Sequence, residues 1–157
     1  MIDQIYTFFN FDMIYIWLNF GLLPFWFILL FFPQSKICKI FVTSIFPILV
    51  LATIDLYLIF KIYKNGFNFL EIFNIYTGLD ELINIFSDKE YIIIFWIHFL
   101  AINLFCGCWI VNDYQKIHMP KFLAFFPILL TYFIGPVGLI VYWFIRIFFG
   151  KKITLYD

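Results

Sequence analysis

Two side chains in apolar parts of this 157-residue chain could carry acid–base chemistry, namely His98 and Asp55. An ionisable residue inside hydrocarbon is costly and is by default a functional candidate. An imidazole beside a carboxylate can take a proton from one atom of a ligand and return it to another. Each residue also has a structural interpretation. His98 could be a core histidine bonded to Asn19 or to a carbonyl, and Asp55 could be an interfacial or capping residue.

Six further residues are expected to bind a ligand around this pair. They are Asn19, Asn103, Trp96, Trp109, Gly135 and Pro136. The amides would orient the ligand, the tryptophans would form its walls, and the Gly-Pro step would free backbone carbonyls that protein or a wet cavity must take up. At about 1.5 Å per residue, Asn19, Asp55, His98 and Gly135 would all lie roughly 8–15 Å deep in one leaflet. We therefore expect them to meet around one hollow.

Other chemistries have less support in the residue pattern. The sequence offers no Cys or Glu in register with His98, which argues against a metal site. Cys106 and Cys108 would point about 200° apart on a helix, so they could neither pair nor share a metal. Together with Cys38 they are expected to be packing residues. Because no Ser or Cys stands beside a base, nucleophilic catalysis is not expected either, and no cofactor is predicted.

The composition predicts an integral membrane protein. The chain is 65% hydrophobic and only 13% charged, which leaves too little polar surface to cover a globule in water. Membrane lipid is therefore the expected partner. The formal net charge is zero and no basic tract is present, so nucleic acid is not an expected partner.

Hydrophobic runs predict an all-α, four-helix bundle in a single transmembrane domain, residues 1–157. The expected spans are 14–32, 37–60, 91–111 and 122–145. Residues 61–90 are too polar to span and are expected to form an amphipathic, interfacial segment between spans 2 and 3. The sequence does not fix the oligomeric state.

Four crossings would place both termini and the 61–90 loop on one side of the membrane. That side would hold Lys61, Lys64, Lys89, Arg146, Lys151 and Lys152, and the other side would hold Lys36, Lys39, Lys116 and Lys121. Basic residues are enriched on the cytoplasmic side. The count therefore favours termini in the cytoplasm of a multi-pass protein, with a bacterial inner membrane as the expected location.

The segment from Trp96 to Asp113 carries a family likeness. It reads WIHFLAINLFCGCWIVND and resembles the W-x-H-x-L-A-x-D-L-F-x-G-x-W-x-x-x-D signature of the abscisic-acid-deficient-four-like family. That family includes the plant plastid neoxanthin synthase and many bacterial proteins. The later TYFIGPVGL, with Tyr142 and Arg146, and the earlier Leu18-Asn19 with Pro24, Trp26 and Pro33 also match. One departure is Asn103, where the family usually has Asp.

The resemblance implies a membrane enzyme that acts on a carotenoid or another isoprenoid. Neoxanthin synthesis opens an epoxide into an allenic alcohol, an isomerisation without net redox that needs no cofactor. His98 and Asp55 would then exchange protons with the substrate. The alternative is a non-enzymatic lipid- or pigment-binding scaffold or assembly factor. A small transporter has less support because no internal repeat is visible.

Overall fold

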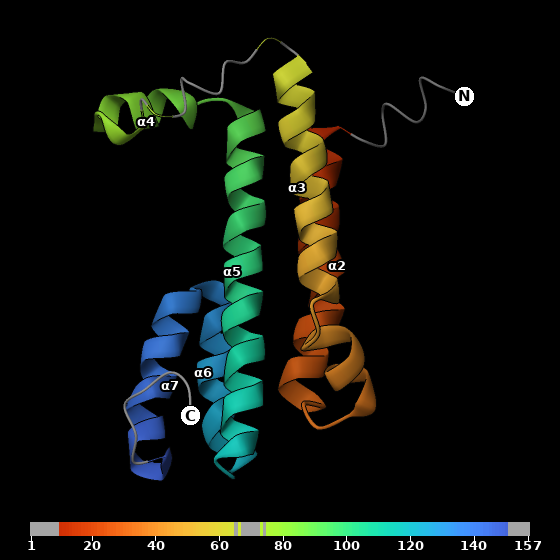
Figure 1. Cartoon of the computed structure of the whole chain (residues 1–157), viewed down its shortest axis with the longest axis vertical. Helices are drawn as coiled ribbons and strands as arrows, with labels where there is room; N and C mark the ends of the chain where they lie inside the picture. The colour runs from red at the N-terminus through yellow and green to blue at the C-terminus, as the bar shows by residue number, and fades with distance from the viewer. Residues whose placement is uncertain (1–9, 65, 67–72, 74, 151–157) are drawn as a thin grey trace. The chain divides into compact units, whose positions relative to one another are not determined.

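The computed structural model describes residues 10–64, 66, 73 and 75–150. Over these residues the chain is all-helical and contains no strand, which confirms the predicted class (Figure 1). The helices are α2 (Phe11–Phe31), α3 (Phe46–Lys64), α4 (Leu79–Ile85), α5 (Lys89–Lys116), α6 (Lys121–Phe133) and α7 (Gly135–Gly150), with a π-helical turn η1 (Cys38–Val42) before α3.

Three helical segments are long and apolar enough to cross a membrane. They are Phe11–Phe31, Cys38–Lys64 and Lys89–Lys116, with mean hydropathies of 2.0, 2.1 and 2.0. A bilayer core of about 30 Å needs roughly 20 helical residues. α6 and α7 are shorter, with 13 and 16 residues. The structure therefore fits a membrane protein with three long apolar helices rather than the predicted four.

Local sequence explains where the first two long helices begin and end. The Asn10 side chain accepts a hydrogen bond from the Met13 N–H at 2.7 Å, which caps the start of α2. Pro33 follows the end of α2. The second expected span, 37–60, is not one regular helix, because η1 and a bend over residues 43–45 precede α3. Pro47, expected in mid-helix, instead lies in the first turn of α3, where its missing N–H costs nothing.

The polar stretch 61–90 forms no membrane-length helix among its described residues. α3 continues through Lys64, and α4 is a helix of seven residues, none of which is buried. Residues 65, 67–72 and 74, including Glu71 of the expected interfacial segment, lie outside the described residues.

The predicted continuous span 122–145 is wrong. α6 ends at Phe133, Ile134 is extended with φ −145° and ψ 92°, and α7 turns back along α6 (Figure 1). A Cβ atom built on Gly138 would lie 2.7 Å from the Pro127 carbonyl oxygen, a contact that only a reversed chain can make. Pro136 falls in the first turn of α7, where proline is compatible with a helix. The Gly135-Pro136 step, expected from the sequence to lie within one span, therefore lies at the turn of a helical hairpin.

The chain divides into two compact units. The first unit contains Met1–Gly21 and Leu49–Phe99, and the second contains Leu22–Ile48 and Leu100–Asp157. Leu18, Leu58 and Ile97 belong to the core of the first unit. Leu29, Leu104 and Tyr142 are fully or nearly fully buried in the second.

Candidate functional site

His98 and Asp55 face each other in the first unit. The Nε2 atom of His98, on α5, lies 3.5 Å from the Oδ2 atom of Asp55, on α3. The His98 side chain is 57% exposed, whereas that of Asp55 is 14% exposed. The imidazole is therefore the more accessible member of the pair, and the carboxylate is mostly buried.

The contact that Nδ1 makes indicates the tautomer of the neutral His98 ring. Its Nδ1 atom lies 2.9 Å from the Ile94 carbonyl oxygen, one helical turn earlier. A carbonyl oxygen can only accept, so Nδ1 must carry the proton in this contact. In the neutral ring Nε2 then holds a lone pair, and it is Nε2 that faces Asp55. The other carboxylate oxygen, Oδ1 of Asp55, is buried and has no hydrogen-bond partner among the described residues.

Trp96 and Asn19 form a second pair in the same unit. The indole Nε1–H of Trp96 donates to Asn19 Oδ1 at 3.3 Å, and the Asn19 amide donates to the Tyr15 carbonyl at 2.7 Å. The Trp96 ring also stacks on Phe99, with ring centroids 5.2 Å apart, and contacts Tyr15 at 5.9 Å. Asn19 thus bonds Trp96 and not His98, so one structural interpretation of His98 does not hold. The other structural interpretation of His98, a hydrogen bond to a carbonyl, does describe the contact between its Nδ1 atom and Ile94.

Asn103 lies in the second unit, where it bonds the break between α6 and α7. Its Oδ1 accepts the backbone N–H of Gly135 at 2.8 Å, and its amide donates to the Tyr132 carbonyl at 3.3 Å. Asn103 is 1% exposed and Gly135 is buried, while Pro136 is exposed. The first N–H of α7 and one carbonyl near the end of α6 are therefore satisfied by one amide. This geometry gives Asn103 and Gly135 a structural role.

Trp109 packs against α7 in the second unit. Its ring lies edge-on to Tyr142, with centroids 5.8 Å apart, and stacks on Trp143 at 6.1 Å. Two residues earlier on α5, Gly107 lets α2 come close, because a Cβ atom there would lie 2.8 Å from the Trp26 ring. Of the eight predicted site residues, the structure thus pairs Asp55 with His98 and Asn19 with Trp96 in the first unit. It gathers Asn103, Trp109, Gly135 and Pro136 around the α6–α7 hairpin in the second. That residues of both sets meet around one hollow in the membrane stays a prediction.

A buried ionic cluster in the second unit was not expected from sequence. The Asp113 carboxylate accepts bonds from Arg146 Nε at 2.6 Å, from Arg146 Nη2 at 3.2 Å and from the Tyr142 hydroxyl at 2.7 Å. Arg146 is 1% exposed and Tyr142 is fully buried. The signal was available, because Asp113, Tyr142 and Arg146 are all positions of the family motif. From the sequence, Arg146 is counted only among the basic residues on one side of the membrane.

Comparison with known proteins agrees with the motif resemblance. No curated protein and no solved structure matches the chain at a significant level. A family model described as ABA DEFICIENT 4-like matches residues 13–142, which is most of the chain and includes Asp55, His98, Asp113 and Tyr142, whereas Arg146 lies just beyond the match. The chain belongs to the ABA DEFICIENT 4-like family.

Proposed function

We propose that this protein is an integral membrane enzyme in which His98 and Asp55 isomerise a carotenoid or another isoprenoid by proton transfer. The observation that carries the proposal is the 3.5 Å contact between His98 Nε2 and Asp55 Oδ2 on two neighbouring helices of the first unit. Family membership is consistent with it, because the resemblance drawn from the motif implies carotenoid conversion.

The route of the proton follows from the hydrogen bonds of the pair. With Nδ1 donating to Ile94, the Nε2 atom of His98 takes a proton from a carbon of the substrate. The Asp55 carboxylate stabilises the imidazolium ion that forms. His98 then returns the proton to an oxygen of the substrate. The buried Asp55 Oδ1 has no hydrogen-bond partner among the described residues, and it would accept a hydrogen bond from a hydroxyl group of the bound ligand.

Opening of an epoxide balances under this scheme. The electron pair of the broken C–H bond forms a new carbon–carbon double bond. The neighbouring C–O bond breaks, and its electron pair stays on oxygen, which receives the proton. One proton leaves carbon and one reaches oxygen, so the product is an alcohol isomeric with the epoxide. The scheme requires no oxidant and no reductant.

Aromatic rings of the first unit suit a long unsaturated hydrocarbon. On α5, Trp96 stacks on Phe99 and contacts Tyr15, and Trp96 points about 200° away from His98 around the helix axis. Tyr15 is 46% exposed. Flat rings of this kind pack well on a planar conjugated chain. A ligand dissolved in the bilayer would meet His98 from the side, since its imidazole is more than half exposed.

The helical hairpin revises the proposed orientation. With three crossings and α7 turned back on α6, the end of α7 lies on the same side as the α5–α6 turn. Arg146, Lys151 and Lys152 then join Lys36, Lys39, Lys116 and Lys121, and only Lys61, Lys64 and Lys89 stay on the other side. We therefore propose that the α5–α6 turn faces the cytoplasm and that the expectation of both termini inside is replaced.

The experiment compares the pigments and lipids of membranes that contain the wild-type protein or a variant. Cells that make carotenoids would produce wild type, His98→Ala, Asp55→Asn, or His118→Gln as a control. His118 is the other histidine of the chain and is exposed. We expect the product isomer with wild type and His118→Gln, and its loss with His98→Ala at equal membrane levels. Unchanged product from His98→Ala would refute the acid–base site.

A lipid- or pigment-binding scaffold is the alternative function. It is favoured by one observation, that Asn103 and Gly135 of the family motif bond each other. A scaffold would retain pigment through purification without converting it. It would also retain that pigment in His98→Ala, so the same set of variants separates the two functions.

A further inference from the structure

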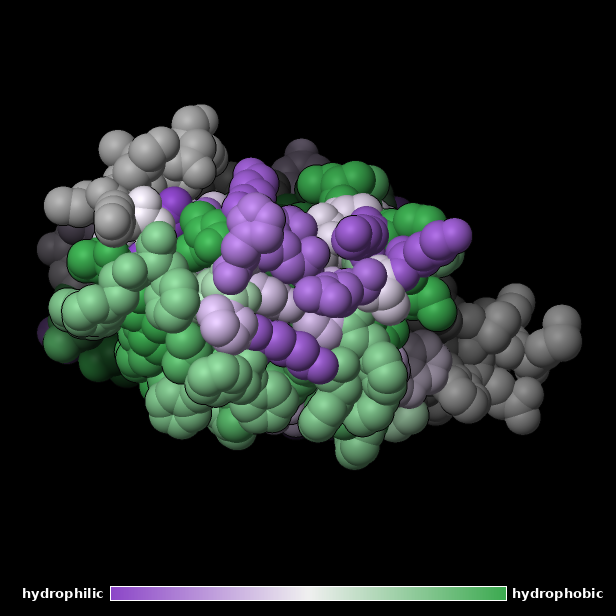
Figure 2. Space-filling view, turned by 90° about the horizontal axis from the view of Figure 1, so that it is seen from below, coloured by the Kyte–Doolittle hydropathy of each residue, from purple (hydrophilic) through white to green (hydrophobic). Residues whose placement is uncertain are grey.

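Uncompensated positive charge gathers at one end of the second unit. Over its described residues, 22–48 and 100–150, the only carboxylate side chain is Asp113, and it is buried against Arg146. The remaining cationic side chains are all exposed lysines, namely Lys36, Lys39, Lys116 and Lys121. We call these four residues the lysine face. Figure 2 views the molecule from below and shows hydrophilic side chains gathered there beside apolar ones.

Hydrogen bonds link the segments that carry these lysines. Lys36 and Lys39 belong to the turn after α2 and to η1, while Lys116 ends α5 and Lys121 begins α6. The Lys121 ammonium donates to the Phe31 carbonyl at 2.7 Å, and the Gln115 amide donates to the Pro33 carbonyl at 3.1 Å. The lysine face is thus one continuous surface and not a set of unrelated loop residues.

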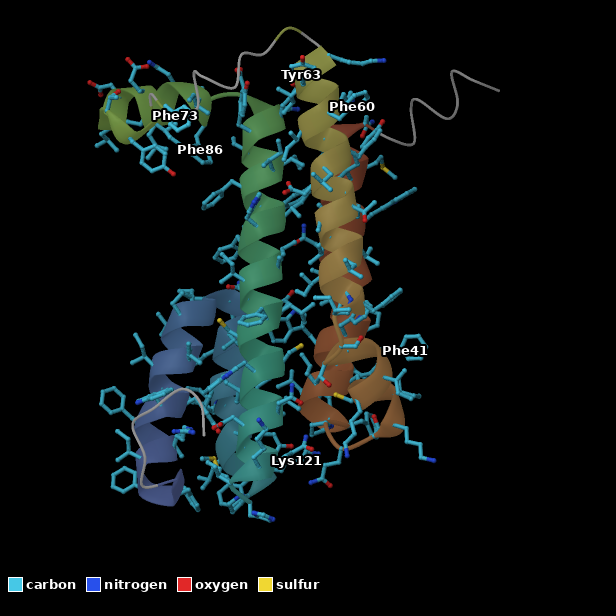
Figure 3. The ribbon with its side chains drawn as sticks, viewed as in Figure 1. Phe41, Phe60, Tyr63, Phe73, Phe86 and Lys121 are labelled. Atoms are coloured by element: carbon cyan, nitrogen blue, oxygen red, sulfur yellow. The ribbon has the colours of Figure 1, made fainter. Side chains whose placement is uncertain are left out.

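A groove opens beside Lys121 at the start of α6. It is lined by Lys121, Phe122 and Phe125 and has a volume of about 470 Å³. Figure 3 shows Lys121 at this end of the hairpin, next to the end of α5. An ammonium group has three donors, so the bond to Phe31 leaves two of them for a ligand. A ligand in this groove would meet a positive charge and two phenyl rings.

We infer that the lysine face binds the headgroups of anionic phospholipids in the leaflet that it borders. Phosphate oxygens would contact the ammonium groups, and acyl chains would lie on the apolar side chains of the same segments. Ile37, Ile40 and Phe122 are 58%, 62% and 73% exposed between and beside the lysines. A basic cluster directly beside apolar helices is the pattern by which proteins hold acidic lipids. An acidic protein partner would match the charge but would leave these apolar side chains uncovered.

The first unit offers a natural contrast. Its described charged residues mix signs, because it holds Lys61, Lys64 and Lys89 together with six carboxylates, namely Asp12, Asp55, Asp80, Glu81, Asp88 and Glu90. Lys89 contacts Asp12 at 3.4 Å, so part of its charge is already balanced. Lysines of the first unit should therefore attract acidic lipid much less than those of the lysine face.

The test measures lipid retention by the purified full-length protein. Protein in neutral detergent is mixed with phosphatidylglycerol or phosphatidylcholine, and bound lipids are counted by native mass spectrometry. We expect wild type to retain phosphatidylglycerol preferentially. Replacing Lys36, Lys39 and Lys116 with Gln should reduce retention by roughly fivefold for each lysine. The same three residues changed to Arg should keep it, and Lys61→Gln/Lys64→Gln/Lys89→Gln is the matched control.

Three results would overturn the inference. One is equal retention of the two lipids by wild type, and another is an equal loss in the control variant. The third is displacement of the lipid by inorganic phosphate at the same concentration, which would identify a site for free phosphate. Because Lys121 is kept, its bond to Phe31 stays intact, and a melting temperature close to wild type shows that the variant is folded. The result is independent of pigment conversion at His98.

Discussion

Asn103 accepts a hydrogen bond from the backbone N–H of Gly135 at 2.8 Å, across 32 residues of sequence. The same amide donates to the Tyr132 carbonyl, so a single side chain of α5 bonds the main chain on both sides of the α6–α7 break. Val137 and Gly138 complete the start of α7 by donating to the Ile134 carbonyl. Every N–H in the first turn of α7 is thereby satisfied, since Pro136 has none.

Loss of the Asn103 amide should loosen this hairpin. Asn103→Ala leaves the buried Gly135 N–H without an acceptor, and we expect a loss of about 1–3 kcal/mol in unfolding free energy. Asn103→Asp retains the acceptor but loses the donor to Tyr132, so ionised Asp should also destabilise. Thermal unfolding of the purified protein measures both. Asn112→Ala, at an exposed position of the same helix, should change little, and an equal drop there would contradict the assignment.

Gly138 is a point of close approach between α6 and α7. A Cβ atom there would lie 2.5 Å from the Thr131 backbone nitrogen and 2.7 Å from the Pro127 carbonyl oxygen. Backbone atoms cannot turn aside, so Gly138→Ala should force the two helices apart and cost about 1–3 kcal/mol. Gly21→Ala is the matched control in α2.

A Cβ atom at Gly21 would have nothing within 4 Å. There Ala should stabilise the helix by about 0.5–1 kcal/mol through its better helix propensity. Opposite signs for the two substitutions, measured by thermal unfolding, are the expected result. Two changes of the same sign would mean that Gly138 does not limit the packing of the hairpin.

The buried cluster of Asp113, Tyr142 and Arg146 should behave as one unit. Arg146→Met would leave Asp113, which is only 7% exposed, without its cationic partner, and should lower the unfolding free energy by about 3–5 kcal/mol. Tyr142→Phe removes one hydrogen bond to a charged group, worth about 1.5–3 kcal/mol. Arg146→Met combined with Asp113→Leu should lose less than the sum of the single changes. An additive double variant, by denaturant or thermal unfolding, would show that the ion pair is not coupled.

Sequence predicted the all-helical class and the family, because both depend on local features. Apolar runs mark helices, and the motif residues keep their spacing along one segment. His98 and Asp55 could also be identified, since a charged group in an apolar run is conspicuous without any knowledge of its neighbours.

The hairpin could not be predicted in the same way. A run of apolar residues with Gly135 and Pro136 inside it fits a kinked span and a reversed pair of short helices equally well. The deciding contacts are long-range, such as Gly138 against Pro127 and Asn103 against Gly135. The burial of Arg146 depends likewise on Asp113, 33 residues earlier. A fourth span and a helical hairpin assign the charge of Arg146 to opposite sides of the membrane.

The reversal at Ile134 makes a testable prediction about membrane topology. Single cysteines would be introduced as Gln34→Cys, Gly78→Cys or Gly150→Cys after the native cysteines are changed to Ser. With three crossings, positions 34 and 150 lie on the same side as the α5–α6 turn, and position 78 lies on the opposite side. A membrane-impermeant maleimide added to intact cells should therefore label position 78 alone, and all three positions should react after permeabilisation. Labelling of 78 and 150 together would restore a fourth crossing, and labelling of 34 and 150 together would invert the proposed orientation while keeping the hairpin.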